Sequence, residues 1–189
     1  AGDKITYVDA GIIPQTPTGQ WRHVAMVIKS GDSRIFVDGV QLGATVTTTF
    51  GNILASNLVS IGRGSGGRYL NGKVDEVRIW TRALCQAEIA AQKDCELGGS
   101  ENGLVAYYKF NQGYASGDNL GLTTLDDAAG TPQNGTLTGF ALTGATSNWV
   151  APGGVTSGNS CSPFDAPDIN LQGGSPLVSI SDGDITPST

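Results

Sequence analysis

The sequence predicts an all-β protein, an antiparallel β-sandwich with one short helix. Short runs of alternating apolar and polar residues recur along the chain, and turns rich in Gly, Asn and Asp separate them. Charged residues make up only 15% of the chain, against about 25% in a typical soluble protein. Hydrophobic residues reach 39%, which is enough for a core. Short strands joined by such turns are typical of antiparallel sandwiches.

Alternation of apolar and polar residues identifies the strands, because successive side chains of a strand point to opposite faces. The second predicted strand runs directly into Asp38-Gly39, a dipeptide that favours a two-residue hairpin turn. The expected strands are Trp21–Lys29, Arg34–Val37, a Thr-rich return from Leu42, Leu58–Gly62, Lys73–Trp80, Leu104–Phe110 and a last short one over Thr136–Leu142.

One helix is expected over Leu84–Gln92, where apolar residues recur at helical spacing. Glu88 lies in its first turn, where a negative charge interacts favourably with the helix dipole. The helix is expected to end near Lys93 and Asp94. The strand patterns in turn predict a core between two sheets that contains Val24, Met26, Ile28, Val77, Ile79, Tyr108 and Phe110.

Changes in composition and periodicity divide the chain into three parts. Residues 1–150 carry the sandwich pattern, residues 151–167 are rich in Gly, Ser and Pro and are expected to form a linker, and residues 168–189 resume a strand-like pattern as the start of a second β module. The opening residues Ala1–Tyr7 are short and polar, and we interpret them as internal to a longer polypeptide rather than as a signal peptide.

Charge and hydropathy exclude two classes of partner. The net charge is −6 and the isoelectric point about 4.5, with no cluster of Lys and Arg. Nucleic-acid binding needs a basic surface, so we expect none. The sequence contains no run of about 18 apolar residues, so we expect no membrane-spanning helix.

The three cysteines are Cys85, Cys95 and Cys161. Cys85 and Cys95 bracket the predicted helix, and we expect a disulfide between them because the composition is that of an extracellular protein. The alternative is two unrelated buried thiols. Cys161 is then left to pair with a cysteine elsewhere. Without a Cys-x-x-Cys pair, a zinc site is not expected.

The residue inventory argues against an enzyme. His23 is the only histidine, and we expect it to be structural within its strand. A serine-hydrolase triad therefore has no free base, and no phosphate loop or dinucleotide fingerprint is present. Asp75 and Glu76 are adjacent on a predicted strand, so they point to opposite faces and cannot act as a glycosidase pair.

Four blocks in chain order resemble the laminin-G-like family of concanavalin-type jelly rolls. They are GQWRHVAMVI (19–28), RIFVDGVQLG (34–43), LVSIGRG (58–64) and LNGKVDEVRIWTRALCQAEI (70–89). The block GLVAYYKFNQG (103–113) is also family-like, but ordinary members carry it first, so the order here resembles a permuted domain. The strands that should precede Gly19 are missing from the expected pattern. The resemblance implies a laminin-G-like sandwich that is non-catalytic.

The resemblance also points to a calcium site. It implies Asp75 and Asp127 as ligands, with Asp126 and carbonyls near Asn134 completing the shell, because calcium prefers carboxylate and carbonyl oxygens. The alternative is that these carboxylates bind loop amides or stay in solvent. Trp21 and Trp80 are expected to pack, whereas Trp149 is open to either packing or stacking on a ligand.

The tail APDINLQGGSPLVSISDGDITPST (166–189) resembles the start of an Ig-like choice-of-anchor D module. Such modules are repeated in surface proteins exported by the type IX route, and permuted sandwiches like the one expected here are common in large surface proteins of gliding and biofilm-forming Gram-negative bacteria. The resemblance implies a secreted, surface-attached adhesin that binds a glycan or a surface protein and contacts secretion or attachment machinery. The alternatives are a structural spacer in a stalk or filament, and an accessory domain of a secreted hydrolase.

Overall fold

The computed structural model describes residues 20–51, 59–63, 67 and 69–162. Its regular elements are β1 (Val24–Val27), β2 (Ser33–Val37), β3 (Val40–Val46), β4 (Val77–Trp80), α1 (Gln86–Gln92), β5 (Leu104–Tyr108), β6 (Thr124–Leu125), β7 (Gly135–Thr136) and the 3-10 turn η2 (Gly144–Thr146).

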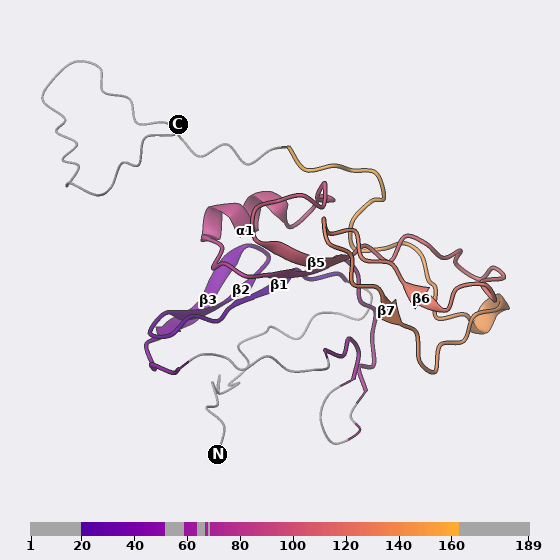
Figure 1. The fold of residues 1–189 in the computed structure, drawn as a ribbon, viewed down its shortest axis with the longest axis horizontal. Coiled ribbons are helices and arrows are strands. Elements are labelled where there is room, and N and C mark those ends of the chain that lie inside the picture. The colour runs from indigo at the N-terminus through magenta and orange to yellow at the C-terminus, as the bar shows by residue number, and fades with distance from the viewer. Residues whose placement is uncertain (1–19, 52–58, 64–66, 68, 163–189) are drawn as a thin grey trace, which may run out of the picture.

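The strands form antiparallel sheets of order β1-β2-β3, β4-β5 and β6-β7. Figure 1 shows α1 over the first sheet, with β6 and β7 at the opposite end of the molecule. Antiparallel strands and a single short helix in the described residues confirm the predicted all-β class. None of the helices in the described part is long and apolar enough to cross a membrane.

The predicted hairpin at Asp38-Gly39 is confirmed. Val37 pairs with Val40, and both turn residues have positive φ, 51° for Asp38 and 81° for Gly39. Two positive φ values in succession are characteristic of the turn that best matches strand twist. A Cβ on Gly39 would lie 3.0 Å from the Ala90 Cα, so a glycine also lets this turn approach α1.

The predicted face of β1 is wrong. Val24, Met26 and Ile28 are 49%, 58% and 49% exposed, whereas Val27 is buried with Phe36, Leu84 and Ile89 in the core under α1. Side chains alternate strictly between the two faces of a strand. Because α1 packs on the face that carries Val27, the three residues expected in the core all point away from it. The alternation itself was predicted correctly.

Sheet β4-β5 is shorter than the sequence indicates, because two residues leave the extended conformation. Glu76 has φ 54° and Phe110 has φ 57°, in a region that strands do not use. The buried residues of this sheet are Ala106 and Tyr107. The residues expected to be buried here are only half-buried, which corrects that prediction for Val77, Ile79, Tyr108 and Phe110.

The helix is confirmed and begins two residues later than predicted. Cys85 is its N-cap, and the backbone N–H of Cys85 donates to Glu88 Oε2 at 2.8 Å. Of the expected strand Leu58–Gly62, Leu58 lies outside the described residues and the remainder is not a strand. Of the expected strand Thr136–Leu142, only Thr136 lies in a strand, β7.

The described part of the expected linker is fastened to the domain, and we call residues 153–161 the strap. Asp75 Oδ2 accepts the backbone N–H groups of Gly154 and Val155 at 2.7 and 3.2 Å, and Glu96 Oε1 accepts that of Gly158 at 3.1 Å. The strap therefore packs as part of the preceding domain. The expected second module, 168–189, lies outside the described residues.

Candidate functional site

Two loops and the start of β5 enclose a hollow of about 410 Å³, which we call the loop hollow. One wall is Gly99–Glu101, the other is Gly130–Gln133, and Leu104 and Val105 line it from β5. The walls touch at Gly99, which has φ +94° and where a Cβ would lie 2.0 Å from the Ala128 carbonyl oxygen. Only glycine fits this contact, so the sequence Gly98-Gly99 sets the spacing of the two walls.

The first wall is held by Glu101. Its carboxylate accepts the backbone N–H groups of Gly98 at 2.7 Å and Gly99 at 2.9 Å. A carboxylate that closes its own loop in this way positions the loop backbone, and each of its oxygens accepts one backbone hydrogen bond.

The second wall is held by Asp127, which is only 6% exposed. Asp127 Oδ1 accepts from the Tyr107 and Ala129 N–H groups at 2.7 and 2.9 Å, and Oδ2 accepts from the Gln133 N–H at 2.9 Å. The Tyr108 hydroxyl donates to the Gln133 carbonyl at 2.9 Å. These bonds fasten the loop to β5 and leave the Gln133 side chain exposed.

The chemistry of the loop hollow is mixed. Ser100 and Thr131 contribute hydroxyl groups, Gln133 contributes an amide, and Val105 is 40% exposed as an apolar surface. A hollow with a few neutral hydrogen-bonding groups beside an apolar patch suits a neutral polar ligand. Sequence reasoning missed these residues, because they lie about 30 positions apart; the Gly98-Gly99 pair was the one local signal.

The residues expected to bind calcium are not brought together. Asp75 accepts from strap amides, and Asp127 accepts from the Tyr107 amide of β5 and from two amides of its own loop. Asp126 is exposed, and its backbone N–H donates to Gln112 Oε1 at 2.9 Å. Within the described ranges no group of three or more His, Cys, Asp and Glu residues could hold a metal ion. The alternative role, binding of loop amides, is what the structure shows for Asp75 and Asp127.

Trp149 cannot stack on a ligand, because it is 5% exposed. Its ring covers Gly113, where a Cβ would lie 2.2 Å from a ring atom, and it packs against Phe140 with centroids 5.9 Å apart. Trp80 and Trp21 are half-buried, and Trp21 lies against Gly154 of the strap. The expected packing role is confirmed for Trp21 and Trp80, and the stacking role is wrong for Trp149.

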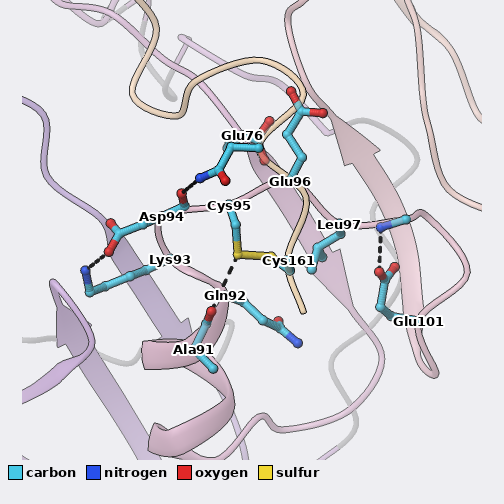
Figure 2. Close-up of a disulfide and its surroundings, with 12 residues drawn as sticks. Glu76, Ala91, Gln92, Lys93, Asp94, Cys95, Glu96, Leu97, Glu101 and Cys161 are labelled. Carbon is cyan, nitrogen blue, oxygen red and sulfur yellow. Dashed lines mark hydrogen bonds and ion pairs between the residues drawn. A yellow bond between two sulfur atoms is a disulfide. The ribbon is translucent and has the colours of Figure 1, made fainter. Parts of the chain in front are cut away.

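The predicted Cys85–Cys95 disulfide is wrong. Cys95 bonds to Cys161 (Figure 2), with a Cα–Cα distance of 4.9 Å. Cys85 is a free, exposed thiol. Nine residues separate Cys85 from Cys95, and seven of them form α1. The helix alone spans about 10 Å, and a disulfide tolerates at most about 6.8 Å between Cα atoms. Cys161 reaches Cys95 because Glu96 and Ser160 form a parallel bridge.

The glutamates are engaged in structural contacts. Glu88 pairs with Arg82 at 2.6 Å, and Glu96 accepts from Lys109 and Asn111 as well as from the strap. Glu76 is 2.6 Å from Arg78 Nη2 and accepts from the Tyr107 hydroxyl at 2.5 Å. Burial raises the pKa of Glu76 despite these two partners.

His23 lies beside the Asp38-Gly39 hairpin turn. Its backbone N–H donates to Asp38 Oδ1 at 3.0 Å beside the hairpin turn. Burial, together with the charge of Arg78, lowers the pKa of the His23 imidazole.

Residues 2–90 match the laminin-G-type family model described as the concanavalin A-like lectin/glucanases superfamily. The match covers just under half of the chain and supports the laminin-G-like resemblance for this part. That description includes both lectins and glucanases, so the match alone leaves a binding module and a glycoside hydrolase open. No curated protein and no solved structure matches the chain.

Proposed function

We propose that this chain is a non-catalytic binding module of a secreted, surface-attached bacterial protein, and that it recognises a glycan or a surface-protein ligand through the loop hollow. The observation that carries the proposal is the combination of hydroxyl, amide and apolar groups in a hollow whose carboxylate is already occupied. A sugar presents hydroxyl groups and an apolar ring face to such a lining.

A binding role is favoured over glycoside hydrolysis by the carboxylates. A glycosidase needs two carboxyl groups free to face the scissile bond. Glu76 and Glu88 are paired with arginines, Glu96 holds the strap, and Glu101 closes its loop. These four glutamates therefore do not supply the two opposed, available carboxyl groups that the reaction requires.

A secreted location is supported by the disulfide between Cys95 and Cys161, since such bonds persist in oxidising compartments. Export by the type IX route and attachment at the surface of a Gram-negative bacterium belong to the same proposal and rest on the resemblance of residues 166–189.

The test is a glycan array probed with the whole purified chain, followed by titration of any ligand found. The double variant Thr131→Ala, Gln133→Ala should weaken binding roughly tenfold or more, because each lost hydrogen bond to a neutral group contributes on the order of 1 kcal/mol. Thr138→Ala, an exposed residue away from the hollow, is the matched control. Equal affinities of the two variants would contradict the assigned site.

The same array tests calcium. Loss of binding in a chelator and recovery with added calcium would show that ligand binding requires the calcium that the family resemblance implies, whereas unchanged binding would exclude that requirement. A chain that binds neither glycans nor surface proteins would instead favour the spacer function.

A further inference from the structure

The apolar side of the loop hollow contains a β-bulge of β5. Two successive residues of β4 pair with Ala106 and Leu104, so Val105 is an extra residue without a partner of its own on β4. Adjacent residues of a regular strand point to opposite faces, whereas a bulge re-aims a side chain and is common beside binding sites. Leu104 and Val105 are adjacent in the sequence, and both line the hollow.

The two residues have different surroundings. Leu104 packs against the buried cluster that contains Tyr107, whereas Val105 is 40% exposed. Within the described lining no residue is aromatic, so the exposed apolar contact is one branched aliphatic side chain. A contact of this size best matches a methyl group, because the gain on burial scales with the apolar area that the two groups cover.

The backbone of β5 beside the hollow is already hydrogen-bonded. The Leu104 N–H donates to the Glu101 carbonyl at 3.0 Å, and the Tyr107 carbonyl accepts the Ala128 N–H at 2.8 Å. The Tyr107 N–H donates to Asp127. An extended peptide that adds a strand to a sheet needs a free edge, so this lining favours a ligand that binds side-chain hydroxyl and amide groups instead.

The charge of the hollow opposes an acidic ligand. Glu101 is the one charged residue in the described lining, and none of the ion pairs formed among the described residues includes it. The groups that donate to its carboxylate are neutral backbone amides. A second negative charge brought into the hollow would therefore be repelled, because like charges in contact are costly when no cation lies between them.

We propose that the loop hollow selects an uncharged sugar that carries a methyl group, as N-acetyl and 6-deoxy sugars do. The methyl group packs on Val105, and the sugar hydroxyl groups bond to Ser100, Thr131 and Gln133. This inference rests on the proposed function and states which glycans the site would accept.

The test uses sugars that differ from one parent at a single position. The whole ¹⁵N-labelled chain is titrated with galactose, 6-deoxygalactose, N-acetylgalactosamine and galacturonate, and with the corresponding glucose set. Shifts of the Val105 and Thr131 amide signals report binding in the hollow. At least one methyl-bearing sugar should bind about fourfold more tightly than its parent, the factor expected for about 0.8 kcal/mol from one buried methyl-sized group. The acidic sugar should bind at least tenfold more weakly than that ligand.

Two valine variants assign the preference to a residue. Val105→Thr keeps the branched shape and replaces one methyl group by a hydroxyl, so the ratio between the methyl-bearing sugar and its parent should fall to about one. Val40→Thr is the matched control, because Val40 is a strand residue of another sheet and is 63% exposed. It should leave the ratio unchanged, and equal ratios in the two variants would overturn the role of Val105.

The outcomes separate this inference from the proposed function. Binding in the hollow without a preference for either methyl-bearing form, or with a preference for the acidic sugar, would overturn the inference and leave the binding site in place. Shifts confined to residues outside the hollow would overturn both. A chain whose amide signals respond to none of the sugars would overturn the inference together with the glycan form of the proposed function.

Discussion

At the scale of a single residue, Tyr107 connects sheet β4-β5 to the segment that follows α1. Its ring is fully buried, its hydroxyl donates to Glu76, and the same oxygen accepts the Leu97 N–H at 3.1 Å. Arg78, which binds Glu76, also donates to the Gln92 carbonyl at 2.6 Å and to the Cys95 carbonyl. The end of α1 is thereby fixed to sheet β4-β5.

Tyr107→Phe should destabilise the domain by about 1–3 kcal/mol, because it leaves a buried carboxylate and a buried N–H with one partner fewer. Urea unfolding measures the change. Tyr114→Phe is the control, since Tyr114 is 76% exposed and exposed substitutions usually stay within about 0.5 kcal/mol. Indistinguishable midpoints would mean that the Tyr107 hydroxyl contributes nothing.

Glu88→Gln should lower the free energy of unfolding at neutral pH. The difference in this free energy between the variant and the wild type should disappear in acid. The hydrogen bond from Arg82 holds the pKa of Glu88 below its ordinary value. A depressed folded pKa stabilises the fold above the unfolded pKa, and this contribution is lost as the pH falls through the folded value. We expect a loss of about 1 kcal/mol or less at neutral pH, as for other partly exposed capping and ion-pair contacts.

The measurement for Glu88 is chemical unfolding of wild type and variant across the acidic range. Arg82→Gln removes the other half of the pair and should show the same closing of the difference with acid. A difference that is constant over the whole range would exclude the ionised pair as its cause.

At the scale of elements, α1 and the β1-β2-β3 sheet stabilise one another. Phe36 is 0% exposed and packs in one cluster with Val27, Leu84 and Ile89. A seven-residue helix is too short to be stable in water by itself. Its stability therefore comes from packing on this face of the sheet.

Phe36→Ala should cost about 3–5 kcal/mol, because it removes buried surface and leaves a cavity under α1. Thermal unfolding followed by circular dichroism measures it, and the helical signal should melt with the sheet. Leu120→Ala, at a side chain that is 67% exposed, is the control. A loss as small as the control's would show that α1 is not anchored through Phe36.

At the scale of the whole molecule, the strap determines how the end of the described chain is placed. The disulfide joins residues 66 positions apart. Asp75 accepts from the strap amides of Gly154 and Val155, and Glu96 accepts from that of Gly158. Whatever follows residue 162 therefore starts from a covalently fixed point near the end of α1.

Cys161→Ser should destabilise the domain by about 4 kcal/mol in the chain-entropy model, because the closed loop is long. Cys85→Ser is the matched control, since Cys85 is free and exposed, and it should change little. A non-reduced digest should yield a linked peptide pair containing Cys95 and Cys161. A Cys85-containing linked pair would contradict the structure.

For the candidate site, the family resemblance singled out Asp75 and Asp127 but assigned calcium as their partner, whereas the structure shows backbone amides. Each carboxylate accepts from a backbone amide far away in the chain, Gly154 for Asp75 and Tyr107 for Asp127, and no local pattern reveals these partners. The loop hollow was missed for the same reason, because its two walls come from loops about 30 positions apart that meet where Gly99 lies against the Ala128 carbonyl.

The sequence by itself determined the all-β class, the Asp38-Gly39 hairpin, the helix α1 and the positions of β1, β2, β4 and β5, because these follow from local turn chemistry and periodicity. Only the tertiary structure decided which face of β1 is buried, which cysteines pair, and that Trp149 is core. Periodicity specifies that a strand has two faces, and it does not specify which face the helix will cover. Likewise, pairing of Cys95 with Cys161 depends on a strap that returns from far along the chain, which spacing cannot encode.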